Sequence, residues 1–467
     1  MTFTKSIIII GGGISGLSVL HYLKKKYPDT SSVKILLLEK NAELGGTVKT
    51  EYHRDWVFEH GPNGFLNRGE PARHVVEKAG GQALLFIEEL GLKDQLITAH
   101  SASSQRFIAI QDKLHLVPTG PMGLLRFKPL SIFDKLRIPL EIFVRRGHRG
   151  EETVYEFGKR RFGKNVSKVF LDPLVNGIYA GDVRRLNLQS AFPKIYEIEQ
   201  KHGSLLKGMI RLAKSRSGRA PQESTVGRLF SFKGGMSQLI EAFYSRYKEH
   251  ILLKEEAASL YLKGEQFVVG TPTKNLLADG IFLCVPANQA ACLVKPVFPL
   301  LSFQLEKIEY APVSVVGLVY RKKAFTKIPE GFGYLIPSWE KKEVLGVLFE
   351  NQIFPHRSDD QHVVLRIMMG GCHHPDVVSR TPAQLTAMAQ EEIQWVLGAR
   401  EDPIHVFIKI WPRAIPQYNS EDLPVRSIIE KELRAIKNFF IVSNYLGGVS
   451  FADCVCQAQM VVNQIKI

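Results

Sequence analysis

A glycine-rich turn near the N-terminus constrains the fold more than any other stretch of the sequence. It stands between an apolar, β-branched run at residues 7–10 and a helical pattern that ends in lysines, and a second apolar run at 33–38 ends on Glu39. Short apolar runs of this kind predict buried parallel strands. A strand, glycine turn, helix and strand in this order predict a Rossmann-like dinucleotide-binding unit.

Each part of the turn has a physical reason. Gly11 permits the tight exit from the strand, Gly13 leaves room for a pyrophosphate, and Gly16 lets the helix approach the sheet. An acid at the end of the second strand accepts hydrogen bonds from ribose hydroxyls, which favours FAD or NAD over NADP. The alternative is an ordinary turn with chance glycines. The pattern assigns cofactor contacts to Gly11, Gly12, Gly13, Ile14, Ser15, Gly16 and Glu39.

Chain length limits the number of domains, and net charge limits the kinds of partner. The 467 residues suffice for two or three domains, and 61 Lys and Arg against 46 Asp and Glu give a net charge of +15. Such a charge suits nucleic acid, membrane lipid or an acidic small molecule. The sequence carries no nucleic-acid motif, so the last two are favoured. The five cysteines form no C-x-x-C pair, which predicts reduced thiols in a cytoplasmic protein.

A second glycine block identifies a family. Residues 41–66 contain L-G-G-x-x-x-T, a strand pattern and a G-P turn, and this order resembles the FAD-containing amine-oxidase superfamily. Lys49 stands where that family usually has arginine, and Asn63 stands where arginine usually follows the proline. The resemblance implies FAD as cofactor, with contacts at Gly46, Thr47, Gly61, Pro62, Asn63, Gly64, Ala257, Val449, Ser450 and Phe451.

Four later blocks are similar to porphyrinogen oxidases. They lie at residues 171–199, 331–337, 408–418 and 444–455. The resemblance implies oxidation of a porphyrinogen by three hydride transfers to flavin N5, with molecular oxygen as acceptor and hydrogen peroxide as product. The flavin then performs the chemistry, so no catalytic side chain and no metal are expected.

The same resemblance assigns a substrate site. Arg106 is expected to pair with a propionate, because a guanidinium fork suits a carboxylate. Phe332 and Leu335 are expected to enclose a pyrrole ring, with Gly333 near the reacting bridge. Met369 is expected to form the opposing apolar clamp.

Residues 119–170 differ in composition from the rest of the chain. They are helical in pattern and mix bulky apolar residues with many cations. That mixture is typical of a helix on an anionic membrane surface, and equally of a solvated basic face on an ordinary helical domain. We therefore expect a cytoplasmic protein, with peripheral binding to the cytoplasmic face of the inner membrane as an open alternative. A homodimer is also left open.

The predicted fold is α/β (α+β overall), with a discontinuous Rossmann-like FAD domain, a mixed-sheet substrate domain and a helical insertion. The FAD domain is expected at 1–90, 206–300 and 413–467, the substrate domain at 91–118 and 301–412, and the insertion at 119–205. Protoporphyrinogen IX is the first expected substrate and coproporphyrinogen III the second. A flavin amine or carotenoid oxidoreductase and a non-catalytic flavoprotein are the remaining alternatives.

Overall fold

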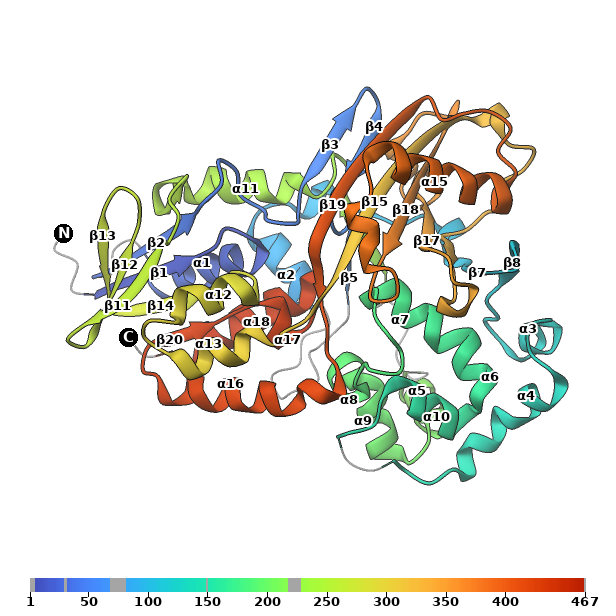
Figure 1. The fold of residues 1–467 in the computed structure, drawn as a ribbon, viewed down its shortest axis with the longest axis horizontal. Helices are drawn as coiled ribbons and strands as arrows, with labels where there is room; N and C mark the ends of the chain where they lie inside the picture. Colours follow the sequence, from blue (N-terminus) through green and yellow to red (C-terminus); the bar gives the residue numbers. More distant parts are fainter. Residues whose placement is uncertain (1–4, 29–31, 68–80, 148–149, 217–227, 466–467) are drawn as a thin grey trace.

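The structure is a computed structural model that describes residues 5–28, 32–67, 81–147, 150–216 and 228–465. The chain forms an elongated molecule with a parallel sheet and its helices at one end (Figure 1). A larger mixed sheet and a group of helices occupy the other end. Residues 214–224 are polar and rich in Pro, Gly and Ser, which predicts a surface loop, but this segment falls largely outside the described residues.

The parallel sheet has the predicted Rossmann-like topology. Its order is β10-β2-β1-β14-β20, and every neighbouring pair is parallel. Chain order reverses beside β1, so the β1–β14 crevice is the switch point where such sheets bind ligands. The strands are β10 (Ile251–Leu253), β2 (Val33–Glu39), β1 (Lys5–Ile10), β14 (Gly280–Leu283) and β20 (Phe439–Ile441).

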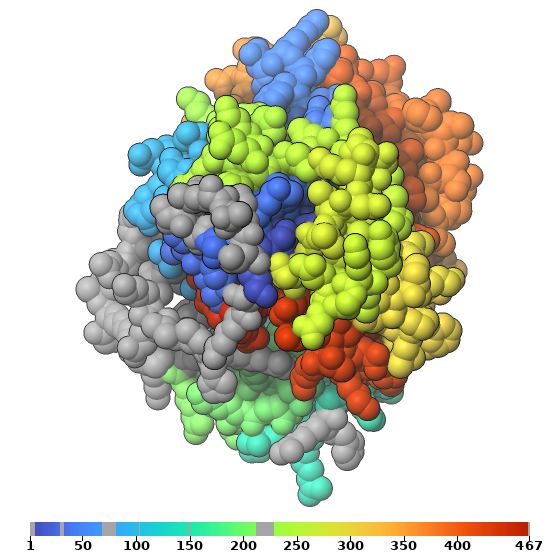
Figure 2. All heavy atoms as spheres, turned by 90° about the vertical axis from the view of Figure 1, so that its left-hand side faces the viewer, coloured from blue at the N-terminus to red at the C-terminus, as the bar shows by residue number. Residues whose placement is uncertain are grey.

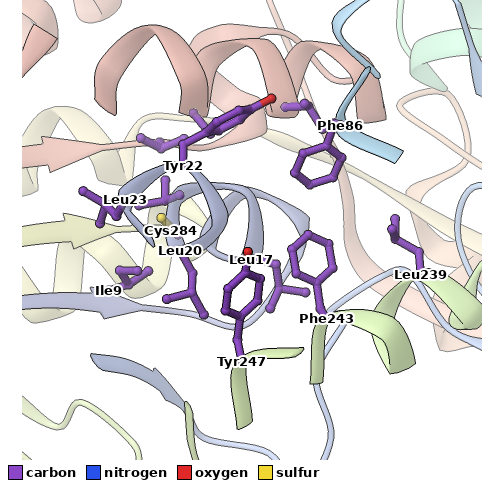
Figure 3. Packing of buried hydrophobic residues seen from close by; sticks show 14 of the residues in the cluster. Ile9, Leu17, Leu20, Tyr22, Leu23, Phe86, Leu239, Phe243, Tyr247 and Cys284 are labelled. Carbon is purple, nitrogen blue, oxygen red and sulfur yellow. The ribbon is translucent and has the colours of Figure 1, made fainter. Parts of the chain in front are cut away.

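The four isoleucines of β1 explain why this strand is central. Ile7 and Ile9 pack in one buried cluster, and Ile8 and Ile10 in another, because side chains alternate along a strand. The first cluster lies under α1 (Ile14–Lys26), α11 (Ser237–Tyr247) and α18 (Phe451–Gln464), as Figure 3 shows around Leu17 and Phe243. The second lies under α12 (Ala287–Val294), α13 (Pro299–Glu306) and α16 (Leu423–Ala435).

Segments far apart in the sequence meet at this end of the molecule. Seen from there, blue, lime and orange-red parts of the chain share one face (Figure 2). The sheet accordingly draws strands from the first 39 residues, from 251–283 and from 439–441. The parallel-sheet end of the molecule is therefore built from segments that are discontinuous in sequence.

The second sheet is mixed and has the order β19-β15-β18-β17-β16-β7-β8. α15 (Pro382–Leu397) covers one of its faces (Figure 1). The sequence of residues 104–118 predicts a β-hairpin with Gln111 and Asp112 at its turn. The β7–β8 pairing confirms it, with these two residues at φ 51° and 58°. The strands are β19 (His405–Pro416), β15 (Tyr310–Arg321), β18 (His362–Gly370), β17 (Val344–Phe349), β16 (Gly333–Leu335), β7 (Phe107–Ile110) and β8 (Lys113–Leu116).

The insertion between β8 and β9 (Leu229–Phe232) is helical, as predicted. Its basic first half breaks into short pieces, because Pro139 ends α4 and starts a 3-10 turn, Pro139–Phe143. No helix of the described residues is both long and apolar enough to cross a membrane. The main helices are α3 (Pro121–Arg126), α4 (Ile132–Arg137), α5 (Val154–Phe162), α7 (Asp172–Tyr179), α9 (Pro193–His202) and α10 (Leu205–Arg216).

Candidate functional site

The first glycine turn forms an open anion site at the end of β1. Gly13 is the N-cap of α1, with extended backbone at φ −76° and ψ 179° and no capping side chain. A Cβ placed on Gly13 would meet no described atom within 4 Å. The free N–H groups of the first helical turn therefore border open space, which suits a pyrophosphate.

The other glycines of the turn serve packing. Gly11 has φ +108°, and a Cβ there would lie 2.6 Å from the carbonyl oxygen of Cys284. A Cβ on Gly16 would lie 1.9 Å from the carbonyl oxygen of Gly11. The fold itself requires glycine at positions 11 and 16, whereas packing does not require glycine at position 13. The ligand is the remaining reason for Gly13.

Glu39 lies beside the glycine turn, where the sequence placed it. Its buried carboxylate accepts hydrogen bonds from the backbone N–H of Gly12 at 2.7 Å and from Asn41 at 2.9 Å (backbone) and 2.7 Å (side chain). A carboxylate has about four acceptor positions, so one remains for a ribose hydroxyl. The N–H of Glu255 donates to the Glu39 carbonyl at 2.9 Å, which brings the half-buried Ala257 segment to the same edge.

The second glycine turn lies directly on the first. The Gly45 N–H donates to the Gly12 carbonyl at 2.8 Å, and a Cβ on Gly46 would lie 3.4 Å from the Gly13 Cα. A Cβ on Gly61 would lie 2.2 Å from the carbonyl oxygen of Thr47. The two glycine turns and the G-P block that follows β4 (Trp56–Glu59) therefore form one continuous cradle.

The G-P block supplies an unused donor. The Asn63 side-chain nitrogen is buried and has no hydrogen-bond partner among the described residues, although its backbone carbonyl accepts from the Ser231 hydroxyl at 2.8 Å. Gly64 packs against the Phe230 backbone, where a Cβ would lie 2.4 Å from the carbonyl oxygen. A buried unpaired amide costs free energy unless a ligand satisfies it. Asn63 thus fits a polar contact to the cofactor.

The chain's last helix meets the first glycine turn. Ser450 caps α18 by accepting from the Asp453 N–H at 3.2 Å, and the Ser15 side chain hydrogen-bonds to Cys454. The Phe451 ring lies 4.8 Å from the Phe65 ring. Val449, just before the cap, packs against the buried cluster of the helical insertion. The closing block therefore lies where all three parts of the molecule meet.

Two cysteines of α18, Cys454 and Cys456, have unreactive thiols. Burial raises the pKa of the Cys454 thiol to about 12 and that of the Cys456 thiol to about 11. Both therefore stay protonated at neutral pH and are poor nucleophiles. Among the described residues, no group of three or more His, Cys, Asp and Glu side chains is arranged to hold a metal ion.

Four of the expected substrate residues lie on or next to the paired strands β7 and β16 of the mixed sheet. The exposed Arg106 guanidinium lies 5.1 Å from the centre of the half-buried Phe332 ring. Gly333 has φ +138°, and a Cβ there would lie 2.0 Å from the Val347 carbonyl oxygen, so strand packing alone requires glycine. Leu335 packs on Gly177 of α7, on the side of the helical insertion.

Met369 does not join them. It is fully buried between the sheet and α15, together with Leu385 and Ile393. Leu335 and α7 lie on the opposite face, where Met368 is half-buried against Leu345. The expectation that Met369 opposes Leu335 is not met, because Leu335 and Met368 both pair with Gly346 and successive side chains of a strand point to opposite faces.

A separate cavity of about 460 Å³ opens at the far end of α1, between His21, Glu89 and Arg246. It is remote from the cradle, which lies at the other end of that helix.

The sequence did not predict a role for Met368 or for the buried Arg366 of β18. An arginine inside the apolar run VVLRIMM was the available signal for the second.

Comparisons with known proteins identify the family of this chain. The profile of the flavin containing amine oxidoreductases matches residues 14–466. Protoporphyrinogen oxidase of Bos taurus is 30% identical over 89% of this chain and 88% of its own. Protoporphyrinogen oxidase 1, chloroplastic, of Arabidopsis thaliana is 27% identical over 97% and 86%. Coproporphyrinogen III oxidase of Bacillus subtilis (strain 168) is 24% identical over 98% and 97%.

The fold has close counterparts among solved structures. A crystallised protein from Exiguobacterium sp. 255-15 superposes with a TM-score of 0.82 and 23% identity, over 99% of both chains. The cradle of glycines, the uncapped helix and the ribose-side acid fit FAD. The chain therefore belongs to the flavin containing amine oxidoreductase family, in its porphyrinogen oxidase branch, and is an FAD-dependent oxidoreductase.

Proposed function

We propose that this enzyme oxidises protoporphyrinogen IX to protoporphyrin IX in haem biosynthesis. The reaction removes six electrons, and three molecules of oxygen become three of hydrogen peroxide. The observation that carries the proposal is the set of relatives named protoporphyrinogen oxidase at 27–30% identity. Coproporphyrinogen III is the second candidate, supported by the Bacillus subtilis relative and by the net charge of +15, which suits a substrate with more carboxylates.

FAD, when bound, supplies the hydride acceptor. The protein's own task is to hold the flexible macrocycle with one bridge carbon in place and to keep water out. Arg106 is proposed to bind a propionate at the edge of the sheet, and Phe332 to lie against a pyrrole ring. Leu335 and Met368, on the same face of the sheet, are proposed as its apolar contacts, with Met368 replacing Met369 in that role.

The proposal is tested by measuring porphyrin fluorescence during turnover of each porphyrinogen in air. We expect kcat/KM to be higher for protoporphyrinogen IX. A preference for coproporphyrinogen III would support the second candidate. Absence of porphyrin from both, with FAD bound, would contradict both and favour an amine or carotenoid oxidoreductase or a non-catalytic flavoprotein.

Arg106→Ala is expected to raise KM without loss of FAD. A charge-assisted hydrogen bond contributes about 1.5–3 kcal/mol, so KM should rise about tenfold to a hundredfold. Steady-state kinetics at several substrate concentrations measure this. Lys113→Ala, an exposed cation of the same hairpin, is the matched control. An unchanged KM for Arg106→Ala would remove that residue from the substrate site.

We also propose peripheral binding to an anionic membrane, on the cytoplasmic face of the inner membrane. The segment from α3 to Phe143 exposes large apolar side chains, with Phe133 80% and Phe143 77% exposed. Exposed Arg126, Lys128 and Arg137 lie among them. Apolar side chains ringed by cations suit insertion among anionic headgroups. The apolar set is Met122, Leu125, Ile132, Phe133, Leu136, Leu140 and Phe143.

The doubly substituted Phe133→Ser, Phe143→Ser protein is expected to sediment less with anionic vesicles than the wild type. High salt should also release the wild-type protein, because salt screens the cationic contribution. Phe303→Ser, an exposed aromatic on α13, is the control. Equal sedimentation of wild type with neutral and anionic vesicles would contradict the electrostatic part of this proposal.

A further inference from the structure

Two consecutive carbonyls of the cradle are held by side chains of the mixed sheet. The Trp411 indole N–H of β19 donates to the His60 carbonyl at 2.8 Å. The Arg366 guanidinium of β18 donates to the Gly61 carbonyl. Both acceptors directly follow β4, at the start of the G-P block, so side chains of the mixed sheet hold the cradle at this turn.

The backbone of Gly61 is flexible, and hydrogen bonds to the carbonyls of this turn hold it in one conformation. Gly61 cannot carry a side chain, because a Cβ would lie 2.2 Å from the Thr47 carbonyl oxygen, and glycine is the most flexible residue. Pro62 follows; it fixes its own φ and disfavours helical ψ at Gly61, but it leaves the φ of Gly61 free. The direction of the Gly61–Pro62 peptide is therefore set from outside, by the donor on its carbonyl.

The donor carries a buried charge that is itself balanced. Arg366 lies 3.8 Å from the Glu350 carboxylate, which lies 4.0 Å from Arg357. Arg357 pairs with Glu59 of β4 at 3.0 Å. Burial lowers the Arg366 pKa, and Glu350 opposes that shift, yet an arginine stays charged in proteins. Two buried arginines and two buried glutamates thus cluster at the joint, with Glu59 contributed by β4 and the other three by residues 350–366.

Stability alone does not account for this cluster. Buried ion pairs are replaced by apolar residues of similar volume with little loss, or with a gain, of stability. An apolar cluster would offer no N–H to the Gly61 carbonyl. The charge cluster is explained by the donor that it holds in place.

We propose that Arg366 and Trp411 are positioning residues that clamp the 60–64 turn and so hold the flavin at a fixed place relative to the mixed sheet. The sheet's role as substrate platform rests on the proposed function. The clamp itself is tested on FAD binding, which needs no porphyrinogen.

The test measures the Kd of FAD for apoprotein by flavin fluorescence, and the fine structure of the bound flavin absorption band. Trp411→Phe removes one neutral hydrogen bond and should weaken FAD binding about threefold. Arg366→Met removes a charged donor and should weaken FAD binding about tenfold, with loss of the fine structure of the flavin absorption band. Arg321→Met, an exposed arginine at the end of β15, should leave both readouts unchanged.

A second variant separates positioning from folding. Arg366→Met leaves Arg357 to balance both Glu350 and Glu59, and is expected to lower the melting temperature. Arg366→Met with Glu350→Leu removes one charge of each sign and should restore it. The double variant should still bind FAD about tenfold more weakly than the wild type, because no donor reaches Gly61. Wild-type FAD affinity in the double variant would overturn the proposal. If the FAD-loaded wild type does not turn over porphyrinogen, and the variants still show the weaker FAD binding described above, the proposed substrate is refuted and the clamp is not.

Discussion

Gly13→Val is expected to give a folded protein without flavin colour. The Gly13 backbone is extended and accepts any residue, and a Cβ there meets no described atom. The new side chain would instead fill the space in front of the α1 N-terminus. Loss of two hydrogen bonds to a charged phosphate costs about 3–6 kcal/mol, so FAD affinity should fall by about a hundredfold or more. Absorbance at the flavin band after gel filtration measures the retained cofactor.

Gly120→Val is the matched control for that experiment. Gly120 is also the N-cap of a helix, α3, has extended backbone at φ −164°, and a Cβ there meets no described atom within 4 Å. Both variants therefore carry the same cost of valine at an N-cap, but only one borders the cradle. A yellow Gly13→Val protein with a full complement of FAD would contradict the assignment of the pyrophosphate to this turn.

Arg161→Met is expected to destabilise the helical insertion strongly. Arg161 is fully buried on α5 and donates to Glu199 at 2.8 Å and to Glu141 at 3.0 Å, and both carboxylates are buried. It also donates to the Gly203 carbonyl at 2.9 Å. Removing Arg161 takes the ion-pair partner from Glu141 and leaves Glu199 with Arg160 at 2.9 Å. Breaking a buried cluster in this way costs about 3–5 kcal/mol. Thermal unfolding followed by circular dichroism should show a lower first transition.

Two comparisons make that result interpretable. Arg184→Met changes an exposed arginine of the same insertion and should melt like the wild type. Adding Glu141→Gln and Glu199→Gln to Arg161→Met removes the orphaned charges and should recover part of the loss. FAD should remain bound, because the cradle belongs to other elements. An unaltered melting curve for Arg161→Met would mean that the cluster is not what holds the insertion together.

Local sequence predicted much of the cofactor half of the molecule. The four isoleucines, the glycine turn and Glu39 lie within 33 residues, and their spacing alone indicates strand, helix and strand. The β7–β8 hairpin was equally predictable, because Gln111 and Asp112 interrupt two apolar stretches. The domain boundaries and the substrate residues stay predictions.

The sequence by itself determined the βαβ unit, the cofactor class and the family, since these depend on residues that are neighbours in the chain. Only the tertiary structure decided which methionine faces Leu335, because the pairing of β16, β17 and β18 sets this and short motifs do not record strand register. It also decided what Arg366 does. That arginine and Gly61 are 305 positions apart, and their contact exists only once two sheets have packed together.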